Sequence, residues 1–381
     1  MAEISVVHTA DNHLDYSFKY RHRLMDRKRD FWESFKEVLD YVLRVKPDLF
    51  LISGDLYHRI NPRNPPRAHV LRYFRMISQH TRIFMVGGHH DTPKSEAEGL
   101  SPLAVIEEAG YGRLFRNVGS VEAEELKVKG FHICVSGMSY PHGWKPGVYN
   151  VSGIPIDGDI NIFMVHGNIQ GFPSYYESEP VIGADSFPRG LHYVAAGHLH
   201  KHQVDKVSGA TVCYPGSTER TSFREYGDEK GFVHLTLDED GLKELRFIKV
   251  KTRPMASVKI KVEGDVSIQS AISSKLTSLT DREAMVRVKI SGFVPRKVID
   301  SYRREDILKE YEGKYFLFVL DDADLLPQEE KIPAVKFTSP LKAFQEYIDK
   351  LILEEKDEKE REILLIARKI GLEALKEGGA W

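Results

Sequence analysis

The sequence predicts an α/β fold in which two β-sheets pack face to face with helices outside, followed by a small β–α unit and C-terminal helices. Short apolar, β-branched runs alternate with segments of helical periodicity in the N-terminal third of the chain. Further short runs then follow with few long helices between them. After Arg253-Pro254 a second, shorter alternation begins. A chain of 381 residues has room for two or three domains of ordinary size.

The N-terminal third alternates strands and helices. Residues 4–7, 49–53 and 83–86 are apolar runs with the length and composition of buried central strands. The segments 30–45 and 67–79 between them carry apolar residues at helical spacing. Because strands joined by helical crossovers pair in parallel, this order predicts a largely parallel sheet.

The middle of the chain contains six more strand-like runs. Few long helices separate them, so we expect more antiparallel pairing here and a second sheet packed against the first. These runs are 131–137, 160–165, 192–196, 211–214, 231–237 and 244–250.

The change in pattern after residue 252 predicts further domains. We expect a large N-terminal domain over 1–252 and a compact β–α–β–α–β unit over 253–326. Prolines mark a linker over 327–339, and 340–381 has the periodicity of a helical pair.

The C-terminal helical pair carries an apolar stripe. This stripe either docks on the body of the chain or is offered to a partner, and spacing alone favours neither reading. Its candidate contact residues are Phe344, Ile348, Leu351, Ile363 and Ile366.

Composition narrows the possible functions. The 54 Lys and Arg residues nearly balance the 56 Asp and Glu residues, so contact with nucleic acid must use a local patch and not a whole-chain basic field. No apolar run reaches the ~18 residues of a membrane span. The N-terminus lacks the features of a secretion signal, so we expect the protein to stay in the cytoplasm. Cys134 and Cys213 fall in strand-like runs and are expected to be buried free thiols.

Five short segments place metal-ligand residues directly after predicted strands. Because the carboxyl ends of parallel strands meet at one sheet edge, the five are expected to converge. Carboxylates and neutral imidazoles suit manganese or iron and tolerate zinc. The seven candidate ligands exceed the needs of one ion, and one carboxylate such as Asp55 can bridge two ions. The seven are Asp11, His13, Asp55, His89, His166, His198 and His200.

Each motif is weaker alone than the set is together. An Asp and a His two residues apart occur often by chance and commonly cap turns. All five motifs at strand ends are a specific pattern, because unrelated core histidines have no reason to share that position. Four other histidines lie within strand-like runs and are expected to be ordinary core or sheet residues, namely His8, His132, His192 and His234.

This ordered set resembles the motifs of the calcineurin-like metallophosphoesterases, and more closely those of the prokaryotic and archaeal Mre11/SbcD nucleases of double-strand-break repair. The similarity extends over nearly the whole chain, because 255–320 resembles that family's capping domain and the C-terminal helices resemble its ATPase-binding segment. The segments that carry the resemblance are His8-Thr9-Ala10-Asp11-Asn12-His13-Leu14, Ser53-Gly54-Asp55-Leu56-Tyr57-His58, Ala196-Gly197-His198-Leu199-His200-Lys201 and Tyr214-Pro215-Gly216-Ser217-Thr218-Glu219-Arg220.

The resemblance implies a two-manganese DNA nuclease of the α/β/β/α sandwich fold. It implies one ion held by Asp11, His13, Asp55 and His200, and a second held by Asp55, His89, His166 and His198. It further implies that His90 supports the transition state or protonates the leaving oxygen, that Asp91 orients the ring of His90, and that His58 assists exonuclease action.

One position departs from the family pattern. The third of the five motifs in chain order contains His89 in this sequence. The family has Asn at the position of His89, and that Asn is a metal ligand. An imidazole can replace the amide oxygen, but it reaches farther and its metal binding depends on pH. Retained binding, loss of the second ion and a shift of catalysis to His89 all remain open from the sequence.

The resemblance also implies partners. These are double-stranded DNA ends or hairpins, a Rad50/SbcC-type SMC-like ATPase bound through the C-terminal helices, and a second copy bound through the helices near 67–79 and 101–110. Candidate DNA contacts are Arg59, Arg63 and Arg67 beside the second motif. The alternatives are a phosphodiesterase of smaller substrates and a DNA-end scaffold with weakened catalysis.

Overall fold

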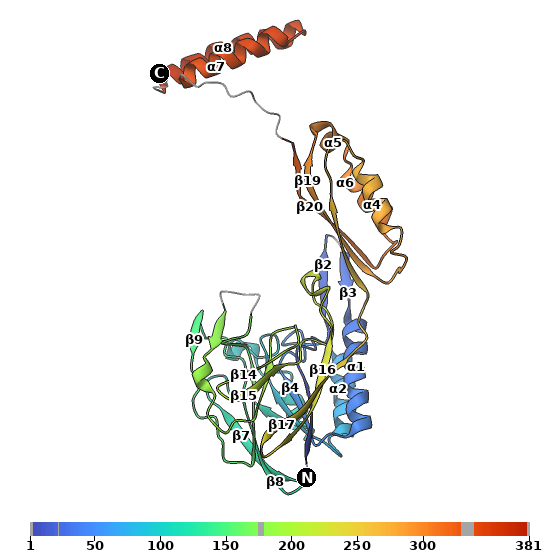
Figure 1. Ribbon diagram of the computed structural model, residues 1–381, viewed down its shortest axis with the longest axis vertical. Coiled ribbons are helices and arrows are strands. Elements are labelled where there is room, and N and C mark those ends of the chain that lie inside the picture. The colour runs from blue at the N-terminus through green and yellow to red at the C-terminus, as the bar shows by residue number, and fades with distance from the viewer. Residues whose placement is uncertain (1–2, 22, 174–178, 329–338, 379–381) are drawn as a thin grey trace. The chain divides into compact units, whose positions relative to one another are not determined.

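The computed structural model describes residues 3–21, 23–173, 179–328 and 339–378 (Figure 1). The chain divides into two compact units, one comprising 1–259, 273–289 and 304–321 and the other 260–272, 290–303 and 322–381. This division does not follow the expected boundaries at 252 and 326, which stay predictions. Residues 329–338 of the predicted linker lie outside the described residues.

The first unit contains a six-stranded sheet in the order β17-β16-β1-β4-β5-β6. The four strands from β1 to β6 in this order pair in parallel, as predicted for the N-terminal third, and β16 and β17 extend the sheet by antiparallel pairing. The strands are β1 (Ile4–Thr9), β4 (Leu49–Ser53), β5 (Arg82–Val86), β6 (Arg113–Phe115), β16 (Gly231–Asp238) and β17 (Gly241–Lys249).

The second six-stranded sheet has the order β14-β15-β13-β10-β8-β7. Its four central strands pair in parallel, and its two edge strands pair antiparallel. The expected increase in antiparallel pairing is therefore confirmed at these edges and at β16 and β17, whereas the parallel pairing in the centre of this sheet was not predicted. Parallel strands must be joined by a long crossover, which is usually an α-helix. Here long loops with short strands provide the crossovers instead. The strands are β7 (Glu122–Val128), β8 (Phe131–Met138), β10 (Ile160–His166), β13 (Tyr193–Gly197), β14 (Gln203–Val207) and β15 (Ala210–Tyr214).

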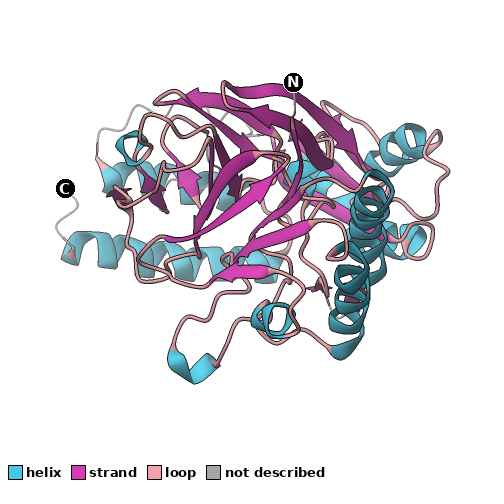
Figure 2. Cartoon of the chain, turned by 90° about the horizontal axis from the view of Figure 1, so that it is seen from below, coloured by secondary structure: helices cyan, strands magenta, loops and turns pink. Residues whose placement is uncertain are grey.

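The two sheets pack against each other through an apolar layer. Val6 and Leu51 of the first sheet and Val135 and Ile162 of the second belong to this buried cluster. Side chains on opposite faces alternate along a strand, so Val7 and Ile52 point to the other side. The predicted sandwich is therefore confirmed, and Figure 2 shows its strands gathered in twisted layers.

Three helices cover the outer face of the first sheet. They are α1 (Lys28–Val45), α2 (Asn64–Ile77) and the short α3 (Ala104–Glu108), and their buried faces join the cluster around Val7 and Ile52. The outer face of the second sheet is covered instead by loops, by η2 (Ala184–Ser186) and by a small sheet. That sheet consists of β9 (Gly147–Tyr149), β11 (Asn168–Ile169) and β12 (Pro180–Ile182).

The apolar residues of α2 and of 101–110 serve the core of this chain. Val70, Phe74, Leu103 and Ile106 are all buried in the helix-side cluster. Ordinary packing therefore accounts for the residues that suggested a dimer surface, and a second copy of the chain stays a prediction.

The remaining elements include the predicted β–α–β–α–β succession. Strands β18 (Met255–Lys261), β19 (Met285–Val294) and β20 (Leu317–Pro327) form a three-stranded sheet with β19 in the middle. Its helices are α4 (Ile268–Leu276), α5 (Arg296–Ser301) and α6 (Arg304–Tyr311), so the second predicted helix is split in two. The other elements are β2 (Ser17–Tyr20), β3 (Arg23–Asp26), η1 (Glu96–Glu98) and η3 (Phe223–Glu225).

The C-terminal helices α7 (Pro340–Glu354) and α8 (Glu358–Glu377) form the predicted pair and lie side by side (Figure 1). Arg368 of α8 pairs with Asp349 of α7 at 2.6 Å, and Ile348 is buried. Ile363 and Ile366 remain 56% and 57% exposed. The packing of the two helices on each other therefore leaves part of the apolar stripe uncovered.

The expectation of two buried free thiols is confirmed for Cys134 and Cys213. None of the helices in the described ranges combines the length and apolarity that a membrane crossing needs. The four expected non-site histidines also have partners in the sheets. His8 contacts Tyr193 and Ser53, and the others bond within or beside strands, namely His132, His192 and His234.

Candidate metal centre

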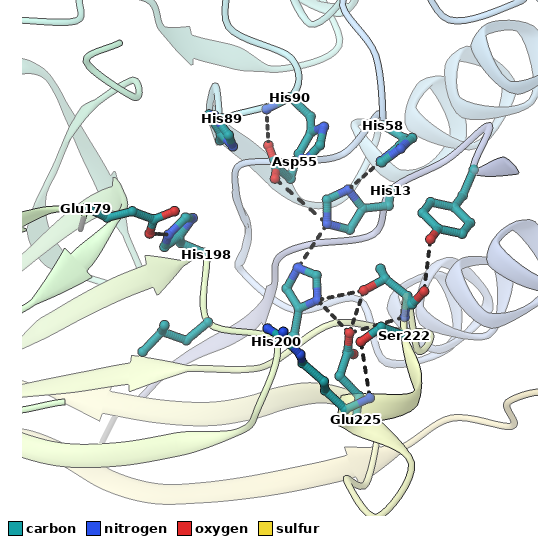
Figure 3. Close-up of a pocket in the computed structure, with 14 residues that line it drawn as sticks. His13, Asp55, His58, His89, His90, Glu179, His198, His200, Ser222 and Glu225 are labelled. Atoms are coloured by element: carbon teal, nitrogen blue, oxygen red, sulfur yellow. Dashed lines mark hydrogen bonds and ion pairs between the residues drawn. The ribbon is translucent and has the colours of Figure 1, made fainter. Parts of the chain in front are cut away.

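Residues of four of the five motifs line one pocket of about 450 Å³ (Figure 3), and His166 of the remaining motif lies behind it, 3.5 Å from the carboxylate of Asp55. Asp11 and His13 follow β1, and Asp55 follows β4, so they lie at the carboxyl ends of neighbouring parallel strands. His166 ends β10 and His198 follows β13 in the facing sheet. The predicted convergence at strand ends is confirmed, with ligands supplied by both sheets.

The structure brings the candidate ligands together in two overlapping groups. In one, ligand atoms of Asp11, His13 and His200 lie within 4.8 Å of one another; in the other, Asp11, Asp55 and His166 do so. Asp11 is common to both groups, whereas the resemblance implied that Asp55 bridges. Asp55 Oδ2 nevertheless lies 3.8 Å from His13 Nε2, so it borders the first group as well.

A third group contains only imidazoles. Ligand atoms of His13, His58 and His90 also lie within 4.8 Å of one another. Three nitrogen ligands without a carboxylate suit zinc better than manganese. The two groups that include carboxylates are the better match to a hard divalent ion.

The surroundings of His166 show that a cation fits this pocket. His166 Nδ1 lies 2.8 Å from the carbonyl oxygen of Ser53, which only accepts hydrogen bonds, so Nδ1 carries the proton. His166 Nε2 therefore presents a lone pair, is buried, and has no hydrogen-bond partner among the described residues. It faces Asp55 Oδ2 at 3.5 Å and Asp11 Oδ1 at 4.0 Å. A lone pair opposed to two carboxylates is an arrangement that a cation bound between them stabilises.

The buried carboxylates lead to the same conclusion. Burial raises the pKa of Asp55 well above its ordinary value, and the charges of Asp91 and Asp11 raise it further. Burial also raises the pKa of Asp11, against the lowering effect of His200 and His198, and raises the pKa of Asp91 to about 6. These groups are costly when ionised together, and bound divalent ions remove that cost.

The backbone is strained where the ligands lie. Asp11, His13, Asp55 and His198 have φ values of 52°, 45°, 51° and 99°, a region that non-glycine residues seldom adopt. Strain of this kind costs on the order of 1–3 kcal/mol per residue and persists where function requires it. Gly54, at φ 85°, precedes Asp55, and a side chain there would collide with the His166 ring. Glycine at this position thus allows the His166 ring to approach the loop that carries Asp55.

Most imidazoles in the pocket are held neutral. Burial is the main cause that lowers the pKa of His13 and His166 well below 6.5, and it lowers the pKa of His58 and His89 to about 4. A neutral ring is the form that binds a metal ion. His200 differs: burial lowers its pKa, but the hydrogen bond and charge of Glu225 outweigh burial and raise it.

His90 and His58 stand beside the first group of ligands. His58 Nδ1 lies 3.3 Å from His13 Nδ1, and the His58 ring stacks on the His90 ring. The backbone N–H of His90 donates to Asp55 Oδ1 at 2.7 Å, which links the third motif to the second (Figure 3). Both side chains line the pocket, where a substrate phosphate would enter.

Asp91 has a different role from the one expected. Its carboxylate accepts the backbone N–H groups of Gly88 at 2.6 Å and of Tyr57 at 3.2 Å, and no hydrogen bond from it to the His90 ring occurs among the described residues. The expected orientation of the His90 ring by Asp91 is therefore corrected. Asp91 is fully buried and holds together the two loops that carry Asp55 and His90.

His89 and His198 line the pocket but belong to neither group that contains a carboxylate. The His89 ring packs near Tyr140 and His142, with centroids 5.1 and 5.4 Å away, and lies 6.4 Å from the His198 ring. His198 Nε2 is 2.6 Å from Glu179 Oε2. The ligand set expected for a second ion is thus only partly assembled around Asp55 and His166.

Two glutamates in the pocket were missed from the sequence. Glu179 contacts His198, and Glu225 contacts His200 Nδ1 at 3.2 Å. Neither lies in a strand-end motif. The only signal for Glu225 was its position shortly after the Tyr214–Arg220 segment, whose residues were matched to the family without a chemical role.

The three arginines proposed for DNA contact lie outside this pocket. Arg63 pairs with Asp15 at 2.9 Å and its side chain is 58% exposed. Arg59 donates to Ser17 at 3.4 Å, and Arg67 Nε is buried without a hydrogen-bond partner among the described residues. Their part in DNA binding stays a prediction.

Comparison with known proteins agrees with the geometry. The sequence is similar to the DNA double-strand break repair protein Mre11 of Methanocaldococcus jannaschii, with 28% identity over 67% of this chain and 69% of that protein. It is 25% identical to Mre11 of Sulfolobus acidocaldarius over 83% of this chain and 82% of the relative. It is also 24% identical to the uncharacterized metallophosphoesterase YhaO of Bacillus subtilis, over 90% and 81% of the two chains.

These similarities confirm the predicted resemblance to Mre11. The family model for calcineurin-like phosphoesterases matches residues 4–202, which include every candidate ligand from Asp11 to His200. The converging strand ends, the paired carboxylate and imidazole groups and this match agree. The chain belongs to the calcineurin-like phosphoesterase family.

Proposed function

We propose that this protein is a manganese-dependent DNA nuclease that acts on double-stranded ends and hairpins in double-strand-break repair. The observation that carries the proposal is the lone pair of His166 Nε2 facing Asp11 and Asp55 inside a pocket assembled from Mre11-like motifs. The chain's similarity to several archaeal Mre11 proteins supports DNA as the substrate.

The pocket supports phosphodiester hydrolysis. Asp11, His13 and His200 would hold one ion, and Asp11, Asp55 and His166 would hold the other. Two bound manganese ions would polarise the phosphate and lower the pKa of water so that hydroxide is available at neutral pH. The neutral ring of His90 lines the pocket, where an N–H can donate to charge that develops on the phosphate or leaving oxygen.

The C-terminal helices support the proposed ATPase partner. Ile363 and Ile366 are exposed on the helix pair and are not buried by the packing of α7 against α8. An amphipathic helix of this kind binds by laying its apolar face into a groove of a partner. We propose a Rad50/SbcC-type SMC-like ATPase as that partner, and a cytoplasmic location beside the chromosome.

Degradation of DNA tests the proposal. Wild-type protein should degrade linear duplex and hairpin DNA with manganese and not after chelation, whereas His90→Ala should be inactive. His132→Ala is the matched control, because His132 belongs to β8 and its ring pairs with Glu125. Cleavage of small phosphodiesters alone would show that the enzyme is a phosphodiesterase of smaller substrates.

The position of His89 supports one alternative. His89 replaces the family Asn and lies outside both groups of ligands that contain a carboxylate. If catalysis at the second ion is weakened for this reason, the protein would act as a scaffold that holds DNA ends. An inactive wild type that gains nuclease activity through His89→Asn would establish the scaffold. Equal or lower activity of His89→Asn would favour the nuclease with an imidazole at this position.

A further inference from the structure

We infer that Glu225 is a positioning residue that fixes His200 in the form and direction needed to bind the first ion. This inference rests on the proposed function only in taking His200 as a metal ligand. Glu225 ends η3, its side chain is 6% exposed, and its Oε1 lies 3.2 Å from His200 Nδ1 (Figure 3).

The contact selects one form of the His200 ring. A neutral imidazole carries its proton on either nitrogen, and the carboxylate oxygen of Glu225 only accepts. In the neutral ring that binds a metal ion, Nδ1 is therefore the protonated nitrogen and Nε2 keeps its lone pair. That Nε2 lies 3.1 Å from His13 Nε2 and 3.8 Å from Asp11 Oδ1, within the first group of ligands.

Lys230 and Thr221 hold Glu225 in place. Lys230 is fully buried; its Nζ donates to Glu225 Oε2 at 2.6 Å and to the backbone oxygen of His200 at 2.8 Å. Thr221 Oγ1 donates to Glu225 Oε1. Lys230 thus hydrogen-bonds to both the Glu225 side chain and the His200 backbone. The His200 residue is therefore held through its ring Nδ1 and through its main chain.

The Tyr214–Arg220 segment completes the support. Ser217 N–H donates to the His200 backbone oxygen at 3.1 Å. Gly216 has φ 80°, and a side chain there would lie 2.9 Å from that same oxygen and from His202 N. The Tyr214–Arg220 segment therefore packs against the backbone of His200 and leads into Glu225.

Burial of the Glu225–Lys230 pair is weak evidence that the pair stabilises the core. Two charges taken out of water are costly, and apolar residues of similar volume replace such pairs at little loss or some gain in stability. The buried pair is accordingly better explained by its contact with His200. Ring orientation by a carboxylate typically changes metal affinity by 10–100-fold.

Manganese binding by the intact protein tests this inference. The signal of free aqueous Mn²⁺ in electron paramagnetic resonance measures binding directly, without DNA. Glu225→Leu/Lys230→Met removes both charges together, and we expect the tighter-bound ion to lose about 10–100-fold in affinity. Glu225→Gln/Lys230→Met keeps an acceptor for Nδ1–H and should lose less. Glu229→Gln is the control, because Glu229 is 62% exposed and pairs with Lys249.

Unfolding of each variant without metal separates folding from positioning. If Glu225→Leu/Lys230→Met folds and binds manganese as the wild type does, Glu225 does not position His200. If that variant does not fold, Glu225→Met/Lys230→Met, which also removes the acceptor for Nδ1–H but keeps the length of both side chains, decides: weaker binding supports the inference, and unchanged binding overturns it. Wild-type protein that binds manganese but leaves DNA intact would refute the proposed nuclease and leave the role of Glu225 standing.

Discussion

The imidazole ring of His58 stacks on that of His90, with ring centroids 4.6 Å apart and planes inclined by 26°. His58 also meets His13 through facing Nδ1 atoms at 3.3 Å. The ring of His58 therefore joins a candidate metal ligand to the residue proposed to act on the leaving oxygen. Burial lowers the pKa of His90 to about 3, so both rings of the stack are neutral near pH 7.

If stacking is what His58 contributes, an aromatic replacement should preserve it. His58→Ala removes a ring contact worth about 0.5–1.5 kcal/mol, so degradation of duplex ends should slow by up to about tenfold. His58→Phe should lose less, because it keeps the stack and removes only the contact with His13. Initial rates with manganese and linear DNA measure both. Equal losses would show that the imidazole chemistry of His58, and not its stacking, is required.

The buried histidines predict a loss of stability in acid. Groups with a folded-state pKa below the unfolded value contribute stability that is present above pH 6.5 and lost as pH falls toward the folded pKa. Buried carboxylates such as Asp91, with a pKa raised to about 6, act in the opposite direction, but fewer groups do so. The histidines with lowered pKa are His8, His13, His58, His89, His90, His142, His166, His202 and His234.

Urea unfolding of the metal-free protein at several pH values measures this effect. The free energy of unfolding should fall between pH 7 and pH 5, by about 1.4 kcal/mol per pH unit for each net proton. A flat profile, or one that rises in acid, would show that the imidazoles are not held neutral.

The pair of Arg27 and Glu219 predicts a large stability effect away from the ligands. Both side chains are fully buried, and Arg27 Nη2 lies 3.2 Å from Glu219 Oε1. Glu219→Ala leaves Arg27 without this partner, which should cost about 3–5 kcal/mol in the free energy of unfolding. Exposed Glu239→Ala serves as the control. Arg27 also pairs with the carboxylate of Asp30. A loss below about 1 kcal/mol in the free energy of unfolding would mean that Asp30 alone is enough to neutralise the charge of Arg27.

The exposed stripe on α8 predicts a separation of functions. Ile363→Asp/Ile366→Asp should abolish co-purification with the ATPase while helicity, manganese binding and DNA cleavage remain. Lys369→Gln, on the same helix, should bind the ATPase normally. Equal loss of ATPase binding and nuclease activity would instead indicate that the helices are part of the folded core.

The sequence predicted the sandwich and the gathering of ligands because both depend on local patterns. Strand-like runs that end in Asp, Gly and His place ligands at the carboxyl ends of parallel strands, and here the strand ends of both sheets meet. The parallel pairing of β8, β10, β13 and β15 escaped prediction, because their crossovers are loops that leave no helical period. The pattern of apolar residues and motifs in the sequence does not show which residues a side chain contacts in the folded protein.

Those partners decide the roles of individual residues. Asp91 was expected to face a ring and instead accepts backbone N–H groups from two loops. Glu225 is 25 positions from His200 in the sequence and meets it only through the fold. His89 was expected among the ligands of the second ion, and it packs near Tyr140 and His142.

Anomalous scattering at the manganese edge, from crystals grown with Mn²⁺, tests the central claim most directly. Two peaks roughly 3.5–4 Å apart are predicted, one beside Asp11, His13 and His200 and the other beside Asp11, Asp55 and His166. An empty pocket, or manganese only at the all-imidazole group of His13, His58 and His90, would contradict the two-ion centre.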